Sequence, residues 1–282
     1  MLVFPNCKIN IGLNILDKRA DGYHNLETIF YPLPLQDIIE IIPQTNGSII
    51  SPVQFTSSGI TIDGSQQQNL CVQAYHLLKK RFTSIPNIQM HLHKAIPMGA
   101  GLGGGSADAA FTLQLLNNKF QLHLTNTQLM DFAIQLGSDC PFFIQNTPSY
   151  ATSRGEVLTP IQLSLKGYTI IIVNPSIHVP TGWAFAALAN LRNNKIRSNK
   201  QPLLQAINLP IIEWKNNIEN DFELPIFNQY PAIQTIKETL YQSGALYAAM
   251  SGSGSSVFGI FKNKQVPSIN FPANYFVFNT SL

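Results

Sequence analysis

Cysteine is scarce in this sequence of 282 residues, which contains only Cys7, Cys71 and Cys140. No two of them have the spacing of a metal-ligand pair, which argues against a cysteine-based metal site. Their odd number, together with the absence of a signal peptide, predicts a protein of the reducing cytoplasm. Because no His motif is paired with Cys140, we expect it to be a small buried residue rather than a nucleophile.

Charged residues are few, and no segment gathers them. The 18 Lys and Arg and the 15 Asp and Glu give a net charge of +3. Without a long basic run, we expect no dedicated nucleic-acid surface, whereas small anionic substrates fit the composition.

Long apolar runs are also missing from the sequence. The run over 170–173 is far too short to cross a bilayer and is typical of a buried strand, so we expect no membrane partner.

Glycine, in contrast, is concentrated in one place. Five of the seven residues from Gly99 to Gly105 are glycines, and residues 106–110 have the pattern of a helix start. Glycines let consecutive backbone N–H groups point into one concavity, and a helix N-terminus attracts negative charge. The segment therefore predicts a phosphate-binding loop rather than a turn used only for helix packing.

Two familiar nucleotide-binding patterns do not fit this loop. Gly99, Gly101 and Gly104 spell G-x-G-x-x-G, but no acidic residue follows about 20 positions later at a strand end. This weighs against a dinucleotide-dependent oxidoreductase. No Gly-Lys-Ser/Thr follows the loop either, and Lys94 precedes it, so the Walker pattern is absent. Phosphate binding stays the expectation.

The periodicity predicts a mixture of strands and helices. Apolar residues alternate with Lys8, Asn10 and Asn14 over 8–16, which is typical of a strand with one face in the core. Its polar face fits solvent or a polar site equally well. Further strands are expected over 26–31, 37–42, 47–55, 88–93, 149–153, 156–158, 168–173, 245–250 and 256–261. Small residues at 251–254 form a loop whose backbone can approach a ligand, and the polar tract 193–200 predicts a mobile surface loop.

Helices are expected at five places: after Asn69 as N-cap, after the glycine loop, after a capping box at 125–128, near Thr181 and over 231–243. The first should bury an apolar stripe made of Leu70, Ala74, Leu77, Leu78 and Phe82.

Three local signals have more than one interpretation. Tyr23 and His24 follow an Asp-Gly turn, where they either pack or bind a nucleobase by stacking and hydrogen bonding. His91 and His93 share a strand face, which we expect to be solvated because no third metal ligand is placed. Asp139 precedes an apolar segment. It is either a turn residue or a partly buried carboxylate with a function.

Three motifs, in order, resemble those of the GHMP kinase superfamily. They are Lys8-Ile9-Asn10, the stretch over 97–106 and the Ser-Gly-Ser-Gly stretch over 251–254, so the resemblance spans nearly the whole chain. It implies an α+β chain with a two-lobed GHMP kinase fold, which has a ribosomal-S5-like N-terminal part and a ferredoxin-like C-terminal part. It further implies an N-terminal ATP-binding domain over 1–150 and a C-terminal domain over 151–282.

Two further stretches, over 20–24 and 137–143, are similar to members that phosphorylate a cytidyl-diphosphate sugar alcohol for non-mevalonate isoprenoid biosynthesis. The resemblance implies that Asp139 is the catalytic base and that Lys8 pairs with it. A carboxylate of this kind accepts the proton of an alcohol during phosphoryl transfer. The residues that it implies for substrate binding are Asn10, Tyr23, His24, Thr181 and Phe185. Tyr23 and Phe185 would sandwich the cytosine, and His24 would hydrogen-bond its edge.

The same resemblance implies that ATP and Mg²⁺ are bound. The implied ATP-binding residues are Asn69, Lys94, Pro97, Gly99, Gly101, Leu102, Gly103, Gly104, Gly105 and Ser106. Ser106 is also the expected Mg²⁺ ligand, because Ala107 stands where some members have a second Ser. A GHMP member acting on a mevalonate derivative and a nucleotide-binding module without catalysis stay open as alternatives. We expect a monomer or a weak homodimer.

Overall fold

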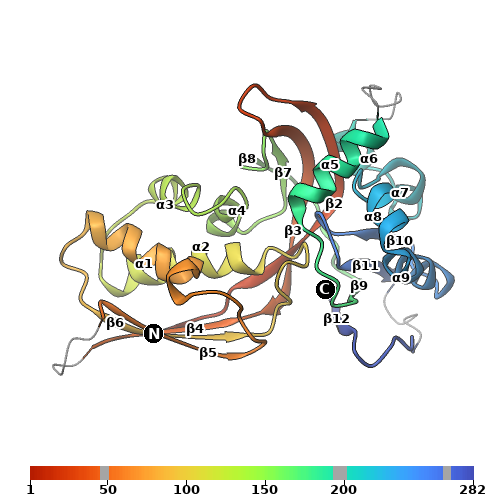
Figure 1. The fold of residues 1–282 in the computed structure, drawn as a ribbon. Coiled ribbons are helices and arrows are strands. Elements are labelled where there is room, and N and C mark those ends of the chain that lie inside the picture. The colour runs from red at the N-terminus through yellow and green to blue at the C-terminus, as the bar shows by residue number, and fades with distance from the viewer. Residues whose placement is uncertain (45–50, 193–201, 263–267) are drawn as a thin grey trace. The chain divides into compact units, whose positions relative to one another are not determined.

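The computed structural model describes residues 1–44, 51–192, 202–262 and 268–282. The chain forms two compact units, each assembled from separate segments (Figure 1). The first unit comprises residues 1–7, 32–98 and 103–147, and the second comprises 8–31, 99–102 and 148–282. The division at 147 lies near the expected boundary at 150, but 8–31 and 99–102 are grouped with the second unit. The tract 193–200 and residues 47–50 of an expected strand lie outside the described residues.

The first unit contains a four-stranded sheet in the order β1-β4-β6-β5. Its strands are β1 (Leu2–Val3), β4 (Ile38–Pro43), β5 (Val53–Gly59) and β6 (Ile88–Lys94). β5 runs parallel to β6, and the other pairs are antiparallel. β6 alternates between buried and more exposed residues, as its sequence predicts. The strand ends on a buried Lys94, which connects it to the candidate site.

Helices α1 and α2 lie over this sheet (Figure 1). The helical elements are η1 (Gln66–Gln68), α1 (Leu70–Arg81), α2 (Gly104–Lys119), α3 (Asn126–Ala133) and α4 (Cys140–Gln145). The two expected caps are confirmed. Asn69 Oδ1 accepts the Cys71 N–H at 2.9 Å. Thr125 N donates to Gln128 Oε1 at 2.9 Å, and Gln128 N donates to Thr125 Oγ1 at 3.3 Å.

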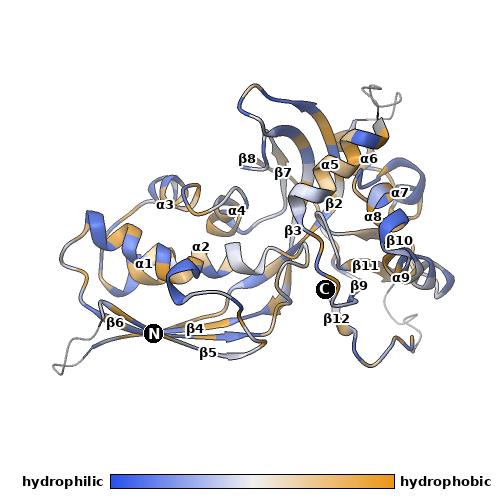
Figure 2. Ribbon diagram, in the orientation of Figure 1, coloured by the Kyte–Doolittle hydropathy of each residue, from blue (hydrophilic) through white to orange (hydrophobic). Residues whose placement is uncertain are grey.

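The buried face of α1 is shifted from the expected stripe, although the helix is amphipathic (Figure 2). Leu78 is buried as expected, but Leu77 is only partly buried, whereas Cys71 and Tyr75 are fully buried. Tyr75 can enter the core because its hydroxyl donates to Pro86 O at 3.1 Å. A tyrosine takes a core position when such a partner is available, and helical periodicity does not reveal the partner.

The second unit contains two sheets, in the orders β2-β3-β7-β8 and β10-β11-β9-β12. The strands of the first are β2 (Asn6–Lys18), β3 (His24–Gln36), β7 (Ser149–Thr152) and β8 (Val157–Pro160). Those of the second are β9 (Tyr168–Asn174), β10 (Tyr247–Met250), β11 (Val257–Lys262) and β12 (Phe276–Ser281), all paired antiparallel. The expected strands over 149–153, 156–158, 168–173, 245–250 and 256–261 are thus confirmed within a few residues, and β12 was not expected.

Five helices complete the described part of this unit: α5 (Thr181–Arg192), α6 (Leu203–Ala206), α7 (Ile211–Asn217), α8 (Glu223–Gln229) and α9 (Pro231–Gln242). α5 and α9 were expected, and Ile233, Ile236 and Leu240 of α9 are buried as predicted. α6, α7 and α8 were not expected, because they are short and prolines lie at 202, 210 and 225. None of the helices within the described ranges is long and apolar enough to cross a bilayer.

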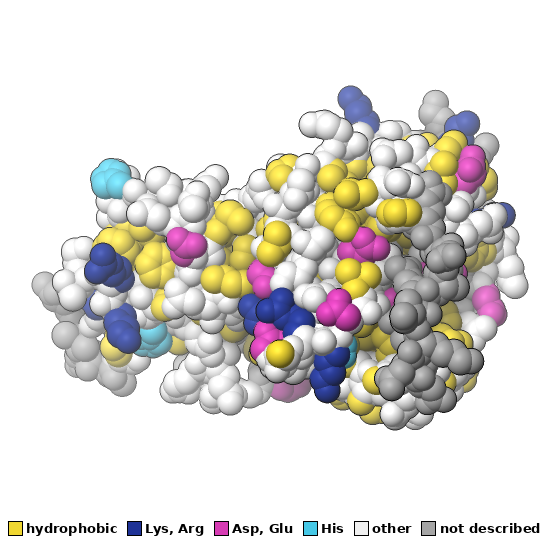
Figure 3. All heavy atoms as spheres, turned by 90° about the horizontal axis from the view of Figure 1, so that it is seen from above, with side chains coloured by type: hydrophobic (Ala, Val, Ile, Leu, Met, Phe, Trp, Pro, Cys, Tyr) yellow, Lys and Arg dark blue, Asp and Glu magenta, His cyan; other side chains and the backbone are white. Residues whose placement is uncertain are grey.

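Positive and negative side chains are interspersed on the face of the molecule shown in Figure 3. On the face shown in Figure 3, Lys and Arg side chains lie next to Asp and Glu at several places. The described residues of that face form no continuous basic patch. This distribution matches the small net charge of +3.

Candidate active site

The polar residues of β2 are buried. Residues 6–15 are buried on both faces of the strand, so solvent does not cover the polar face. Lys8 is only 3% exposed. Its ammonium group donates to Asn10 Oδ1 and to Gly101 O, the latter at 3.2 Å, and it lies 4.9 Å from the ring centroid of Phe30. A buried charge requires such partners. The face of β2 is therefore an organised polar site.

Asn10 connects this site to the small-residue loop at 251–254. Its backbone N–H donates to Ser251 Oγ at 3.1 Å, and its Nδ2 donates to Thr28 Oγ1 at 3.0 Å. Ser251 Oγ donates in turn to Gly101 O at 2.8 Å. Gly101 has φ of +77°, and a Cβ there would lie 1.9 Å from Ser251 O. Only glycine fits at this contact.

The first half of the glycine loop is held by backbone hydrogen bonds within the second unit. Lys8 N donates to Leu102 O at 2.9 Å, and Ser256 N donates to Ala100 O at 3.1 Å. Leu102 is buried, whereas Gly99 is exposed. Of the residues expected to bind ATP, Gly101 and Leu102 are therefore hydrogen-bonded to Lys8, and Gly99 begins the same segment.

The second half of the loop forms the N-terminus of α2. Gly103 is the N-cap residue, with φ of +71° and no side-chain cap, and the helix then runs for 16 residues. The first N–H groups of a helix have no partner within the helix, so they can bind an anion. Gly103, Gly104, Gly105 and Ser106 are thus placed as a phosphate site requires.

Asp139 belongs to the same unit as this helix N-terminus. It precedes α4, is partly buried, and makes no capping hydrogen bond with its side chain. Burial raises the pKa of the thiol of the next residue, Cys140, and the Ser106 hydroxyl opposes this shift. A Cβ at Gly137 would lie 3.3 Å from Cys140 Sγ and 3.9 Å from Ser106 Oγ. The segment containing Asp139 therefore packs against the start of α2.

Cys140 itself is a buried residue, as expected. It is 0% exposed, and burial raises the pKa of its thiol to about 12. The thiolate is the reactive form of cysteine, so this side chain is inert near neutral pH. All three cysteines are buried and none forms a disulfide.

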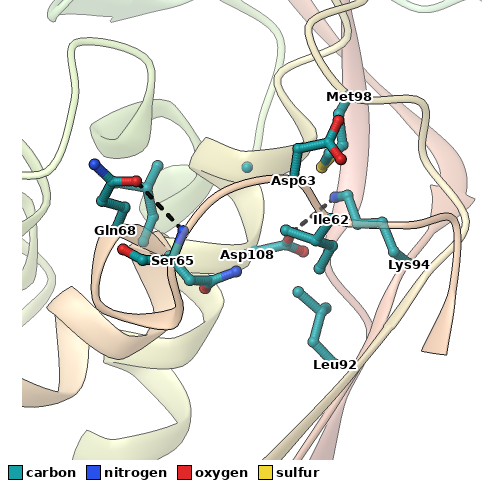
Figure 4. A pocket seen from close by; sticks show the side chains of 11 residues that line it. Ile62, Asp63, Ser65, Gln68, Leu92, Lys94, Met98 and Asp108 are labelled. Atoms are coloured by element: carbon teal, nitrogen blue, oxygen red, sulfur yellow. Dashed lines mark hydrogen bonds and ion pairs between the residues drawn. The ribbon is translucent and has the colours of Figure 1, made fainter. Parts of the chain in front are cut away.

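A cavity of about 170 Å³ lies in the first unit (Figure 4). Its lining residues are Ile62, Asp63, Ser65, Gln68, Asn69, Leu70, Leu92, Lys94, Met98, Gly105 and Asp108. Three expected ATP-binding residues, Asn69, Lys94 and Gly105, are thus brought together. Pockets for drug-sized ligands usually measure about 300–1,000 Å³. This cavity suits a base-sized group rather than a complete nucleotide.

Lys94 is engaged by two carboxylates that the sequence analysis did not identify. Its Nζ lies 2.7 Å from Asp108 Oδ2 and also contacts Asp37 Oδ2, and it is 2% exposed. Figure 4 shows Lys94 and Asp108 pointing toward each other. Asp37 Oδ1 accepts the N–H groups of Ala95 and Ile96 at 2.6 and 2.9 Å. Two of the three hydrogens of the Lys94 ammonium group are therefore used by these carboxylates, which leaves one for its expected contact with ATP.

Asp37, Lys94 and Asp108 form a buried triad of charged groups, in which the pKa values of Lys94 and Asp108 are shifted. Desolvation by burial raises the pKa of Asp108 to about 7, although Lys94 opposes the shift. Burial alone would lower the pKa of Lys94, but the two carboxylates outweigh it and raise that pKa. Asp108 Oδ1 is buried without a hydrogen-bond partner among the described residues. Such a group is expensive to ionise.

We expect Asp108→Asn to flatten the pH dependence of stability. The pKa of Asp108 rises from 3.8 to about 7 on folding. The unfolded chain therefore releases a proton that the native state keeps, and the free energy of unfolding falls between about pH 4 and 7. Urea unfolding at about pH 5 and pH 8 should show that the wild type loses about 2 kcal/mol more than the variant over this interval.

The exposed carboxylate of Asp131 provides the control for this measurement. Asp131→Asn should lose as much stability between the two pH values as the wild type does. Equal losses in Asp108→Asn and the wild type would contradict the assignment of this pH dependence to Asp108.

The expected cytosine-binding residues lie in the second unit, but they form no open sandwich. The His24 ring stacks on Phe185 with centroids 4.7 Å apart and an interplanar angle of 15°. Burial lowers the pKa of His24. Tyr23 is 56% exposed, and the guanidinium group of Arg154, which the sequence analysis missed, lies 4.9 Å from its ring centroid. A base that stacks on this face of Phe185 would have to take the place of His24.

Thr181 is the first residue of α5, which also carries Phe185. Its Oγ1 lies 3.0 Å from Ser253 Oγ, so a hydrogen bond connects the start of α5 to the loop at 251–254.

His91 and His93 belong to no metal site among the described residues. His91 hydrogen-bonds Thr56 and Ser58 at 2.8 and 2.9 Å.

Comparisons with known proteins first define the class. The family model for the GHMP kinases N terminal domain matches residues 69–146, and the model for GHMP kinases C terminal matches 203–268. A solved 4-(cytidine 5'-diphospho)-2C-methyl-D-erythritol kinase is 28% identical, with a TM-score of 0.76, over 92% of this chain and 90% of that one. A solved mevalonate kinase has a TM-score of 0.69 at 12% identity, over 99% and 98% of the chains, and shows the fold alone. The chain has the GHMP kinase fold, as its motifs predict.

Full-length relatives narrow this class. A 4-diphosphocytidyl-2-C-methyl-D-erythritol kinase of Bacteroides fragilis is 48% identical over 283 residues, which cover 100% of both chains. Relatives of the same name from Parabacteroides distasonis and Cytophaga hutchinsonii are 48% and 47% identical, over 93% and 94% of this chain and 92% and 93% of theirs. The chain belongs to the family of 4-diphosphocytidyl-2-C-methyl-D-erythritol kinases.

Proposed function

We propose that this chain transfers the γ-phosphoryl group of ATP to the C2 hydroxyl of 4-diphosphocytidyl-2-C-methyl-D-erythritol, giving the 2-phosphate and ADP. The observation that carries this proposal is the 48% identity to the Bacteroides fragilis kinase over the full length of both chains. A mevalonate derivative as acceptor is supported by the fold alone, at 12% identity.

Asp139 is the base in this reaction. Its carboxylate is partly buried at the start of α4 and is not used to cap that helix. A positioned carboxylate accepts the proton of the acceptor hydroxyl as that oxygen attacks phosphorus. Its segment packs against the N-terminus of α2 through Cys140 and Ser106, which supports a role at the phosphates.

Lys8 supplies a fixed positive charge. Its ammonium group is buried and is oriented by Asn10 and by Gly101 O. A cation that is already held in place stabilises the charge developing in the transition state without reorganisation. Asn10 uses its side chain to hold Lys8 and Thr28, so we assign it to the orientation of Lys8 as well as to the acceptor.

The N-terminus of α2 binds the phosphates of ATP, and the cavity beside Asn69 and Gly105 binds its base. Mg²⁺, when bound, neutralises charge on the β and γ phosphates. The described residues contain no group of three His, Cys, Asp or Glu that could hold a metal ion. We therefore assign Mg²⁺ mainly to phosphate oxygens and water, with Ser106 as one protein ligand.

The cytosine of the acceptor takes the place of the His24 ring on Phe185 and stacks between Phe185 and Tyr23, while His24 turns to its polar edge. In Phe185→Ala, we expect KM for the acceptor to rise by about 10- to 100-fold, because stacking contributes about 1–3 kcal/mol per base. KM for ATP should stay unchanged. Initial rates of ADP release against acceptor concentration measure both constants.

Phe227→Ala is the control for this variant. Phe227 is also a partly buried phenylalanine of the second unit, in α8. It should leave KM for the acceptor unchanged. If Phe185→Ala also leaves that constant unchanged, the cytosine is bound elsewhere.

The activity itself is tested by ATP-dependent ADP release with 4-diphosphocytidyl-2-C-methyl-D-erythritol, mevalonate, phosphomevalonate and diphosphomevalonate as acceptors. Turnover with the cytidyl substrate alone is the expected result. Turnover only with a mevalonate derivative would replace the substrate and keep the kinase class. ATP binding without turnover on any of the four would favour a nucleotide-binding module without catalysis.

A further inference from the structure

The segment 219–221, which precedes α8, extends the sheet at the edge of β2. Leu13 N donates to Glu219 O at 2.9 Å, and Asp221 N donates to Leu13 O at 2.8 Å. Asp221 Oδ2 also accepts the Ile15 N–H at 2.6 Å. The strand that carries Lys8 is thus bonded, a few residues further on, to a segment in which the sequence predicted no helix or strand.

Asn220, in the middle of this segment, binds the main chain around the loop at 251–254. It is 3% exposed, and its Nδ2 donates to Met250 O and to Gly252 O, both at 2.8 Å. Its Oδ1 accepts the Phe222 N–H at 3.0 Å. Both partners of Nδ2 are carbonyl oxygens, which can only accept. The site therefore requires a side chain with two donor hydrogens in this position.

Glu223 holds the same main chain from its other side. It is 8% exposed, and its Oε1 accepts the Met250 N–H at 2.8 Å. Its Oε2 accepts a hydrogen bond from Lys237 Nζ at 2.6 Å. Met250 is thus fixed through both its N–H, by Glu223, and its C=O, by Asn220. The residue immediately before the loop is therefore held by hydrogen bonds on both sides.

The loop that these residues fix lies against the proposed reaction site. Ser251 Oγ donates to Gly101 O and accepts the Asn10 N–H. A Cβ at Gly252 would lie 3.3 Å from both Asn10 Oδ1 and Gly101 Cα. Asn10 Oδ1 is the atom that holds the ammonium group of Lys8. A displacement of the loop would therefore move Asn10, Gly101 and Lys8 together.

We propose that Asn220, assisted by Glu223, is a positioning residue for phosphoryl transfer. It acts through Met250 and Gly252, which set the loop at 251–254, and thereby Asn10, Lys8 and the first half of the glycine loop. This inference rests on the proposed function. Misplacing groups at a reaction centre by about 1 Å can lower the rate by about 100-fold.

The test is Asn220→Asp, which keeps the shape of the side chain and replaces the donor by an acceptor that faces two carbonyl oxygens. We expect kcat to fall by about 10- to 100-fold, with KM for ATP and for the acceptor changed by less than about threefold. As the pH is lowered, the kcat of the variant relative to the wild type should recover, because a protonated carboxyl group donates one of the two lost bonds.

Asn174→Asp is a closely matched control. Asn174 is 4% exposed, and its Nδ2 also binds two oxygens, Ser255 Oγ and Ser256 Oγ, at 3.0 and 3.1 Å. Its Oδ1 also accepts an N–H two residues further on, from Ser176. Of its two partners on the Nδ2 side, the Ser256 hydroxyl can turn and donate to a carboxylate, while the Ser255 hydroxyl keeps its own bond to Ile177 O at 2.6 Å. We expect kcat of this variant to stay within about threefold of the wild type.

Amide hydrogen exchange provides a measurement that does not depend on activity. Ser251 N donates to Ser256 O at 2.9 Å, and Gly254 N donates to Ser251 O at 3.0 Å. Exchange at both should be faster in Asn220→Asp than in the wild type and unchanged in Asn174→Asp. A wild type without turnover would overturn the proposed function, while faster exchange in Asn220→Asp would still support the fixing of the loop by Asn220.

Two results would overturn the inference in an active enzyme. One is a kcat for Asn220→Asp within about threefold of the wild type. The other is an equal loss of kcat in Asn220→Asp and Asn174→Asp. If Asn220→Asp does not fold, Asn220→Ala is judged by the same criteria, since it removes the donor without placing a charge beside the carbonyl oxygens.

Discussion

Replacing Asp139 by Asn is expected to lower kcat by about 10²- to 10⁴-fold, which is the usual contribution of a positioned general base. Asn has the shape of Asp but cannot accept the proton of the acceptor hydroxyl at neutral pH. Because Asn has nearly the same size and shape as Asp, the substitution should leave the fold and the affinity for ATP nearly unchanged. Steady-state ADP release gives kcat, and calorimetric titration with a non-hydrolysable ATP analogue gives the affinity.

Asp131→Asn is the control for this measurement, since Asp131 is an exposed carboxylate of α3 in the same unit. It should keep the kcat of the wild type. A kcat for Asp139→Asn within about tenfold of the wild type would remove Asp139 from the role of base. A loss of ATP affinity together with kcat would instead indicate that Asp139 supports the nucleotide site.

The backbone elements near the motifs were predictable because their signals are local. The Asn69 cap, the capping box of α3 and the alternation along β2 depend on residues within one turn or strand. The alternation did not reveal that both faces of β2 are buried. Lys8 tolerates burial because Gly101 O, far away in the sequence, accepts one of its hydrogens. That partner follows from the fold and not from the spacing of residues.

The same reason explains the residues that were missed. Asp37 lies before β4, Lys94 ends β6, and Asp108 lies within an alanine-rich stretch of α2, so no sequence spacing joins the three. Asn220 lies in a segment that the sequence did not assign to any element. A single Asp or Asn in such a position is typical of a turn, and only its buried contacts distinguish it.

The glycine loop also combines a predictable and an unpredictable part. Its composition indicates phosphate binding, and the N-terminus of α2 gives that prediction a structural basis. Residues 99–102, however, are held by Lys8 N, Ser251 Oγ and Ser256 N of the second unit. The glycine loop therefore depends on polar groups near both ends of the chain. The three motifs, at 8–10, 97–106 and 251–254, are far apart in the sequence but are joined by these hydrogen bonds.

Lys94→Met should destabilise the protein by about 3–5 kcal/mol, because removing one partner of a buried ion pair leaves charge without compensation. Here the substitution would leave both Asp37 and Asp108 buried in contact with an apolar side chain. A total stability of about 5–15 kcal/mol is usual for a folded domain, so the loss is a large fraction of it. Urea unfolding monitored by circular dichroism measures the change.

The loss should be larger at about pH 8 than at about pH 5, because Asp108, whose pKa is raised to about 7, is protonated at the lower pH. Combining Lys94→Met with Asp108→Asn should recover part of the stability, since one of the two uncompensated carboxylates is then removed.

Lys79→Met is the control, because Lys79 Nζ binds the carbonyl oxygens of Thr83 and Ile85 instead of carboxylates. It should cost only about 1 kcal/mol. Equal losses in Lys94→Met and Lys79→Met would mean that the two carboxylates find other partners, and the triad would then contribute little to the stability of the nucleotide site.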